Sequence, residues 1–346
     1  MKKFADAHVH MTDIDFGTCK RFLDEIASQN VTHVALQSLT YRSVAYNLSL
    51  LYWKEHYKDI EIAVFGMVHN EDFYKEIPYE VQAKALIEMG CDGIKFMYAP
   101  DTRKKLGHAI CDARYDKMFS YLEENDIPVT IHVNDPEKLW EKRELTEYEI
   151  LRGWGYCDGT YLSKQEIYEE AFAMLNKHPK LKVTFAHFYF LSCFMEEAVR
   201  VMETYPNVKF DLAPGWEMFL GFSQDIDAWQ AFFEKYSDRI LFGTDCNNIK
   251  DFNPAIYQLV RMALSHDKTE FKMPCYGGHV IKGLDLSEKT LDKICFENYA
   301  GLVGTPKPVK MDRVLQAAQR MLCDVEGMEE ENMVRAGLWA KELLHK

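Results

Sequence analysis

The chain has 346 residues, of which 47% are hydrophobic, so it can bury a large core. Its 41 basic and 54 acidic residues give a formal net charge of −13, which repels polyanions, and no Lys/Arg run with interleaved aromatic residues occurs. Nucleic acid is therefore not an expected partner. The longest apolar stretch, residues 183–195, is too short to span a bilayer, so no membrane association is expected.

Two features of the chain predict a cytoplasmic location. The N-terminal sequence MKKFADAHVH lacks the apolar core of a signal peptide. The chain has nine cysteines, an odd number, and none of them forms a CxxC pair. Such usage indicates free thiols in a reducing compartment rather than a disulfide framework.

Apolar, β-branched runs alternate with amphipathic helical stretches along most of the chain, which is typical of a parallel sheet with crossover helices. Eight strands are expected, at residues 3–9, 32–38, 60–67, 91–97, 127–133, 181–187, 207–213 and 239–245. The helical stretches between them include residues 19–29, 81–90, 115–125, 227–236 and the segment that follows Ser163. Eight such units predict an α/β fold, a closed (β/α)8 TIM barrel, over residues 1–304.

Two segments depart from a minimal barrel. Residues 134–162 are too many for an ordinary connection and are rich in Trp and Tyr, so we interpret them as a lid insertion over the barrel rim. A surface excursion stabilised by its own aromatic residues is the alternative. Residues 305–346 predict a C-terminal helical extension of one or two amphipathic helices, which would cap the barrel or form the contact of a homodimer.

Residues of types that bind metal ions stand at the ends of four expected strands. These are His8 and His10 on the first strand, His132 on the fifth, His187 on the sixth and Asp245 on the eighth. Alternate residues of a strand point to the same face, roughly 6.6 Å apart, so His8 and His10 can converge on one ion. Because the carboxyl ends of barrel strands form a single rim, the five residues predict a shared metal site.

The ordered set of motifs resembles the amidohydrolase superfamily and, within it, the amidohydrolase-related branch. Besides the metal-binding residue types, the resemblance is carried by GIKF (93–96), IHV (131–133), AHF (186–188), FGTD (242–245) and ENYAGLVG (297–304). It extends over about residues 4–304 and implies a (β/α)8 metalloenzyme. It implies no particular substrate, because the branch includes both hydrolases and non-oxidative decarboxylases.

By this resemblance His8, His10, His132 and Asp245 bind one divalent ion, usually zinc. His187 matches a histidine that faces the substrate in single-metal members and binds the second ion in two-metal members. Lys95, at the end of the fourth strand, has three open roles. It is a free amine opposite a substrate carboxylate, a carbamylated lysine that bridges two ions as in two-metal members, or part of a structural ion pair. We favour the free amine.

Four further residues are candidates for substrate binding. Arg114, Trp154 and Tyr156 lie in the loops after the fourth and fifth strands and could shape a pocket for a planar acid, while Glu217 follows the seventh strand. A core or surface role remains open for each of them.

The expected ligand set also predicts a chemistry. Three imidazoles and one carboxylate leave a zinc ion with net positive charge and an open position, so a bound water ionises near pH 7. Asp245 would accept the proton of this water, while His187 and the metal polarise the substrate carbonyl. We therefore expect a metal-dependent hydrolase of a small acidic or aromatic compound. A decarboxylase of the same branch and a non-catalytic ligand-binding barrel remain the alternatives.

Overall fold

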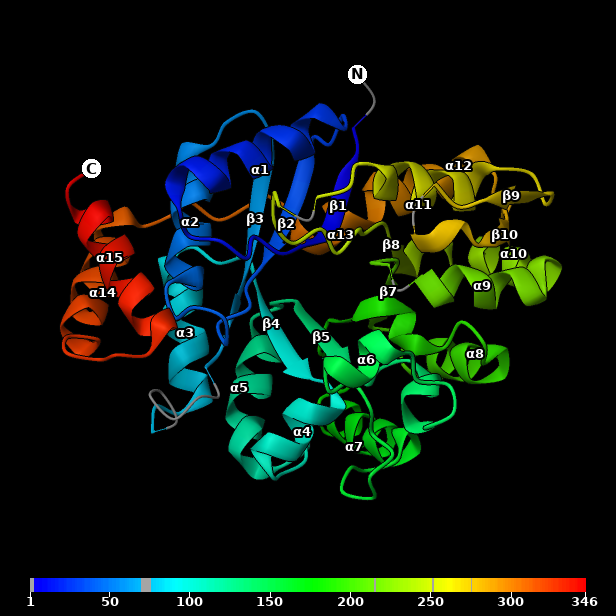
Figure 1. The fold of residues 1–346 in the computed structure, drawn as a ribbon, viewed down its shortest axis with the longest axis horizontal. Coiled ribbons are helices and arrows are strands. Elements are labelled where there is room, and N and C mark those ends of the chain that lie inside the picture. The colour runs from blue at the N-terminus through cyan, green and yellow to red at the C-terminus, as the bar shows by residue number, and fades with distance from the viewer. Residues whose placement is uncertain (1–2, 70–75, 215, 251, 275) are drawn as a thin grey trace.

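The computed structural model describes residues 3–69, 76–214, 216–250, 252–274 and 276–346. Eight parallel strands form one sheet in the order of the sequence, and helices surround it (Figure 1). The strands are β1 (Ala5–Val9), β2 (His33–Gln37), β3 (Glu61–Met67), β4 (Gly93–Tyr98), β5 (Val129–Val133), β6 (Val183–Phe185), β7 (Val208–Asp211) and β8 (Ile240–Leu241). Each coincides with a predicted strand, and the predicted TIM barrel is confirmed.

The last strand returns to the first, so the sheet is nearly closed. Val9 and Cys246 form a parallel bridge just beyond β8. The Ala7 amide donates to the carbonyl of Phe242 at 2.9 Å, and the Asp245 amide donates to the carbonyl of His8 at 2.8 Å. Residues that follow β8 are thereby held beside the end of β1, as a metal site shared by these two strands requires.

Helices follow the strands along the chain, and the five predicted ones are all present. The helices around the barrel are α1 (Phe16–Ser28), α2 (Tyr46–His56), α3 (Tyr79–Met89), α4 (Pro100–Leu106), α5 (Ala113–Glu124), α7 (Lys164–Lys177), α8 (Met195–Thr204), α9 (Trp216–Gln224), α10 (Ile226–Lys235), α11 (Ala255–Ser265), α12 (Glu288–Asp292) and α13 (Asn298–Val303). Ser163 caps α7 in the predicted capping box with Glu166. An antiparallel hairpin of β9 (Glu270–Lys272) and β10 (Val280–Lys282) was not expected.

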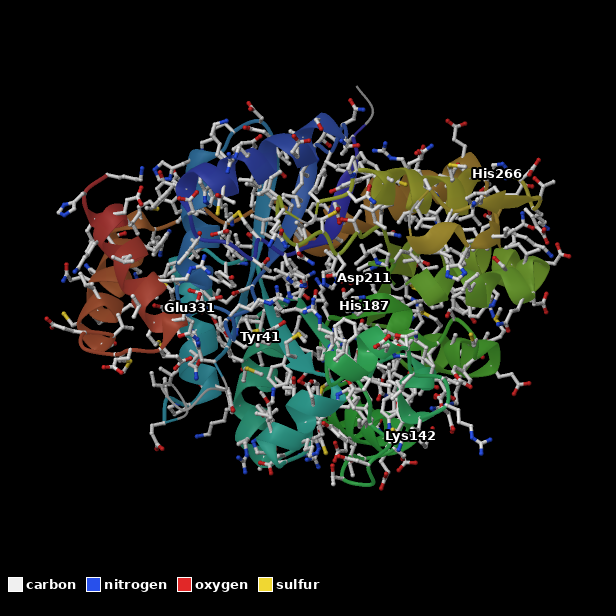
Figure 2. The ribbon with its side chains drawn as sticks, in the orientation of Figure 1. Tyr41, Lys142, His187, Asp211, His266 and Glu331 are labelled. Atoms are coloured by element: carbon white, nitrogen blue, oxygen red, sulfur yellow. The ribbon has the colours of Figure 1, made fainter. Side chains whose placement is uncertain are left out.

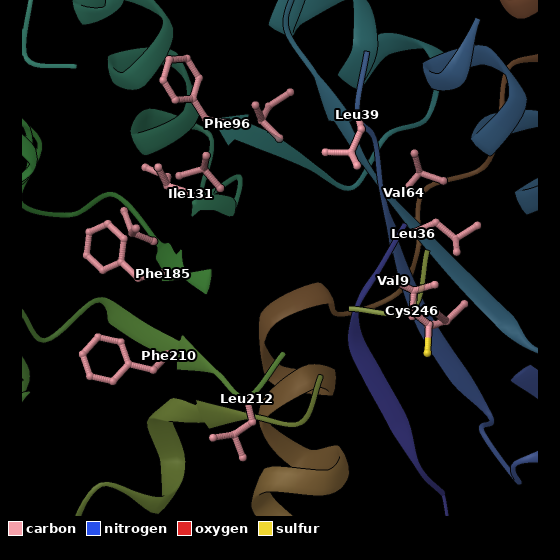
Figure 3. Close-up of a cluster of buried hydrophobic side chains, with 14 of the residues drawn as sticks. Val9, Leu36, Leu39, Val64, Phe96, Ile131, Phe185, Phe210, Leu212 and Cys246 are labelled. Carbon is pink, nitrogen blue, oxygen red and sulfur yellow. The ribbon is translucent and has the colours of Figure 1, made fainter. Parts of the chain in front are cut away.

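Alternation along the strands decides which side chains enter the barrel. Phe96, Ile131, Phe185 and Phe210 point out of the sheet from successive strands and belong to the large core under the helices (Figure 3). Their neighbours in the sequence therefore point inward. Inside the barrel, a second apolar cluster includes Ala5, Ala7, Ala35 and Ala63 from β1 to β3, together with Tyr299 and Leu302 from α13.

The C-terminal residues form a helical hairpin of α14 (Met311–Asp324) and α15 (Glu331–Leu344). The hairpin lies beside α2 and α3 on the outer side of the barrel (Figure 1). Trp339 of α15 stacks on Phe16 of α1, with ring centroids 6.0 Å apart. The segment thus packs on the barrel wall and does not cap the barrel. Among the described residues, no helix is long and apolar enough to cross a membrane.

Gly93, at the start of β4, lies where the barrel has no room for a side chain. A Cβ atom there would lie 2.5 Å from a ring carbon of Phe65 and 2.7 Å from the carbonyl oxygen of Pro128. We expect Gly93→Ala to lower the free energy of unfolding by about 1–3 kcal/mol, because overpacking forces its neighbours to move. Urea unfolding followed by circular dichroism measures the change.

Gly301 of α13 provides the matched control, since its Cβ would meet no atom within 4 Å. Gly301→Ala should leave stability unchanged or raise it by about 0.5–1 kcal/mol, because alanine loses less backbone entropy in a helix. Equal unfolding midpoints for the wild type and Gly93→Ala would contradict the packing argument.

Candidate active site

A β-bulge in β1 brings both histidines of the first strand into the barrel. Asp6 pairs with Val34 of β2 but Val9 pairs with Leu36, so β1 contains one extra residue between these two pairs. Asp6 points outward, where its carboxylate accepts a hydrogen bond from Tyr257 of α11 at 2.8 Å. The extra residue shifts the alternation of inward-pointing and outward-pointing side chains along β1 by one position. His8 and His10 can then both face the interior, and their Nε2 atoms lie 3.0 Å apart.

The Nδ1 atoms of His8 and His10 both make hydrogen bonds to groups outside the histidine pair. His8 Nδ1 donates to the carboxylate of Asp211 at 2.8 Å, and His10 Nδ1 donates to the carbonyl of Gln37 at 2.7 Å. A carbonyl oxygen can only accept, so the proton of His10 is on Nδ1. The two Nε2 atoms that face each other therefore each carry a lone pair.

His132 of β5 and His187, which follows β6, form a second pair of the same kind. His132 Nε2 donates to the carbonyl of Asn134 at 3.0 Å, and His187 Nδ1 donates to the carbonyl of Ala213 at 3.1 Å. Their other nitrogens, His132 Nδ1 and His187 Nε2, face each other at 3.1 Å. The rings of His187 and His8 lie 5.3 Å apart, so the two pairs adjoin.

Burial keeps these rings neutral. It lowers the pKa values of His8, His10 and His187 well below the ordinary value, because a buried imidazolium loses its hydration. The positive charge of Lys95 lowers the pKa values of all three rings further. At neutral pH these three histidines therefore offer lone pairs rather than positive charges.

This donor set fits a divalent metal ion. One ligand atom each from His8, His10 and Asp245 lies within 4.8 Å of the others, and Asp245 Oδ1 is 3.6 Å from His8 Nε2 and 3.4 Å from His10 Nε2. Two imidazole lone pairs beside a carboxylate form an anionic N/O ligand set of the kind that binds zinc and similar ions. The structure thus brings together three of the four predicted ligands, and it places His132 opposite His187.

Asp211 is a site residue that the sequence analysis missed. It ends β7, is fully buried, and accepts the His8 Nδ1 proton on one oxygen. Its other oxygen accepts from the backbone amides of His187 at 2.9 Å and Ala213 at 3.1 Å. A signal was present, because Phe210 points outward and the next residue must point inward. A carboxylate behind a ligand histidine fixes its tautomer and its orientation.

Lys95 of β4 lies within the histidine cluster. It is fully buried, and its Nζ is 3.2 Å from His8 Nε2. Burial lowers the pKa of Lys95 to about 8, against the attraction of Asp211 and Asp245, so most of the amine is still charged at neutral pH. An inward direction is expected for Lys95, because its neighbour Phe96 points outward. The amine of Lys95 therefore lies beside the proposed metal ligand His8.

Tyr156 is the only predicted substrate-binding residue of the long insertion that the described contacts connect to the cluster. The insertion contains the 3-10 turn η1 (Glu137–Trp140) and the helix α6 (Glu147–Leu151). The Tyr156 hydroxyl donates to Asp135, and the other oxygen of Asp135 is 3.4 Å from His132 Nε2. Tyr156 is buried, and its ring contacts Trp140 at 4.8 Å. The insertion thus reaches the site through Asp135, and its role as a lid stays a prediction.

The other predicted substrate-binding residues are not placed at the cluster by the described contacts. Arg114 pairs with Asp112 at the first turn of α5, with Nε and Oδ1 2.9 Å apart. Trp154 is 45% exposed, and its amide donates to the carbonyl of Glu149. The backbone of Glu217 lies in the first turn of α9, and its side chain lies outside the described part of the structure.

A parallel barrel with imidazoles and a carboxylate at its strand ends is the architecture of metalloenzyme barrels. A sequence model of the amidohydrolase family matches residues 6–300. The chain therefore belongs to the amidohydrolase family. No curated protein matches the chain.

Solved structures share the fold at low sequence identity. A putative amidohydrolase from Staphylococcus aureus is 15% identical, with a TM-score of 0.55 over 87% of this chain and 99% of that one. A probable 2-pyrone-4,6-dicarboxylic acid hydrolase from Acinetobacter baumannii is 13% identical, with a TM-score of 0.50 over 88% and 100%. The 4-oxalomesaconate hydratase of Rhodopseudomonas palustris is 13% identical, with a TM-score of 0.51 over 87% and 84%.

The contacts of Asp211 predict an effect on metal affinity. Asp211→Asn removes the charge that holds the His8 ring, so we expect zinc affinity to fall about 10- to 100-fold while the barrel stays folded. Titration against a competing chelator gives the affinity, and circular dichroism reports the fold. Unchanged zinc affinity in a folded Asp211→Asn protein would show that Asp211 does not support the site.

Proposed function

We propose that the protein is a metal-dependent hydrolase that cleaves a small acidic or aromatic compound with a metal-activated water. The observation that carries this proposal is the convergence of the His8 and His10 lone pairs on Asp245 at the end of the barrel. A divalent ion, when bound there, supplies a Lewis acid and ionises a water near neutral pH. His8, His10 and Asp245 would hold it, with His132 beside them.

Asp245 is suited to accept a proton in this reaction. Its side chain is 33% exposed, so substrate and water can approach it, and partial burial raises its pKa above the ordinary value. A carboxylate with a raised pKa is a stronger base than a free aspartate at neutral pH. The nearby charge of Lys95 opposes this shift.

The ring of His187 is positioned to accept a proton on Nε2. Its Nδ1 proton is engaged by Ala213, and burial keeps the ring neutral, so Nε2 offers a lone pair to the site. In this state it can take a proton or bind an ion. To polarise a substrate carbonyl, as the sequence analysis expected, His187 must first gain a proton, which Asp245 or the attacking water can supply.

The buried cation Lys95 in the site supports an acidic substrate, while the family implies no particular substrate and the similar structures support only the shared fold. Metal-loaded protein should be assayed with carboxylated esters, lactones, amides and aromatic acids, with products identified by mass spectrometry. Hydrolysis products that disappear on chelation are expected. Release of CO2 without uptake of water would instead assign the protein to the decarboxylase alternative, and no metal-dependent turnover of any compound would overturn the proposal.

The position of His187 predicts a variant that separates chemistry from metal binding. We expect His187→Asn to lower kcat about 100-fold or more while one zinc ion per chain is retained, because general acid–base catalysis contributes about that factor. Elemental analysis and steady-state kinetics on the substrate found above measure both quantities. Near-wild-type kcat with normal zinc content would show that His187 has no role in the reaction. Loss of one of two ions would support a two-metal site.

A further inference from the structure

The hairpin of α14 and α15 carries a large share of the exposed apolar side chains of the molecule. Twelve large hydrophobic side chains of the described residues are exposed, and four of them lie on this hairpin: Leu315, Met328, Val334 and Leu338. The hairpin forms one edge of the molecule (Figure 1). Glu331, where α15 begins, lies well away from His187 and Asp211 (Figure 2). This exposed surface is therefore separate from the candidate active site.

Each helix of the hairpin has apolar residues outside the row that it buries. The buried rows belong to the large core and include Met321 of α14 and Trp339 of α15. On α14, Leu315 and Leu322 follow each other at a spacing of two turns beside the buried row, and Leu338 on α15 is 63% exposed. Helices that are apolar on more than one side are normally covered on each of those sides. We therefore expect the outer face of the hairpin to have a partner.

The two helices leave an apolar groove between them on this outer face. The groove has a volume of about 420 Å3, and Gln319, Glu326 and Lys341 lie at its exposed rim. Its apolar lining includes Leu322, Val325, Met328, Met333, Val334 and Leu338. Gly337 also lines the groove and has no side chain to fill it, so the most exposed leucine of the hairpin stands directly beside an unfilled space. The groove can accept an apolar side chain from a partner.

Charge is distributed unevenly along the hairpin. Residues 324–331, at the turn between the two helices, contain five acidic side chains and no basic one. The opposite end, residues 310–313 and 339–346, contains four basic and two acidic side chains. The hairpin is thus negative at its turn and positive at its other end. A uniformly acidic or uniformly basic partner would match only one of these ends.

We infer that the outer face of the hairpin docks on the same face of a second copy of the chain, with the two hairpins antiparallel. A two-fold axis that crosses α15 near its middle, at Gly337 and Leu338, places the acidic turn of each hairpin on the basic end of the other. The charges are then matched twice. Leu338 of each copy enters the groove of the other beside Gly337, so the dimer buries the exposed leucines. This inference does not depend on the proposed enzymatic function.

Sedimentation equilibrium of the full chain tests the contact. We expect the wild type to sediment as a dimer, at twice the 40.4 kDa of one chain. Leu338→Glu places two like charges at the centre of the interface, so its dissociation constant should rise about 30-fold or more, the scale of a lost interface hot spot. Leu151→Glu makes the same change at a more exposed leucine on α6 and should dimerise like the wild type. Circular dichroism confirms that both variants are folded.

Charge exchange tests the antiparallel arrangement. Glu329→Lys with Glu330→Lys reverses charges at the turn, and Lys310→Glu with Lys341→Glu reverses charges at the other end. Each double variant should dimerise more weakly than the wild type. A mixture of the two should form a heterodimer more stable than either variant alone, because the unchanged acidic turn of one meets the unchanged basic end of the other. Fluorescence-detected sedimentation with one variant labelled measures the heterodimer.

Three results would overturn the inference. They are a wild type that stays monomeric, a Leu338→Glu protein that dimerises as tightly as the wild type, and a mixture of the double variants that forms no heterodimer. A monomeric wild type would mean that another protein, or none, covers this face. None of these measurements involves metal or substrate, so their failure leaves the hydrolase proposal standing, and a failure to find metal-dependent turnover leaves the dimer measurable.

Discussion

The constraint on which the site depends is the repulsion between imidazole lone pairs that face each other. His8 and His10 meet at 3.0 Å, and His132 and His187 meet at 3.1 Å, each through a nitrogen whose ring partner already donates outward. Two such nitrogens repel unless a proton or a cation lies between them. Because burial disfavours protonation of His8, His10 and His187, a metal ion bound at the proposed site would relieve this repulsion.

Backbone strain is concentrated at the same strand ends. The four consecutive residues His187–Phe190 all have positive φ, from 51° to 57°, and Asp245 has a φ of 55°. Left-handed backbone costs L-residues roughly 1–2 kcal/mol each. Aromatic packing holds the turn in place: Tyr189 stacks on Phe185 at 3.9 Å, and its carbonyl accepts from the Tyr168 hydroxyl at 2.7 Å. The fold thus tolerates strain where it presents His187 and Asp245 to the interior.

Much of the fold and part of the site could be predicted from the sequence, because both follow from simple periodicity. Alternating strands separated by amphipathic helices predict the barrel, and the end of each strand predicts the rim. His132 and Lys95 follow from the same alternation, as their neighbours Ile131 and Phe96 point outward. Asp211 could have been found by this rule as well. A carboxylate that binds no ion directly carries no motif of its own.

The remaining features depend on contacts between distant residues. The bulge in β1 is set by pairing with β2, and no local pattern around His8 predicts it. Asp135 lies two residues after the end of β5. Its hydrogen bond with Tyr156 depends on how the 20 residues between them fold back, and no local periodicity in the sequence predicts that path. Arg114 looked like a rim residue, but Asp112 lies two residues earlier and pairs with it. Charge pairing within one turn is easily overlooked when only residue type is considered.

The charges around the mouth of the barrel also bear on the proposal that an acidic protein acts on an acidic substrate. Within the site the charge of Lys95 is offset by the carboxylates of Asp211 and Asp245, so a divalent ion, when bound there, would leave the mouth of the barrel positive. The net charge of −13 is spread over the surface, where salt screens interactions beyond about 8 Å. Inside the mouth, where water is partly excluded, the local cations act with little screening. The proposed binding of an anionic substrate therefore depends on the site itself and does not require attraction by the molecule as a whole.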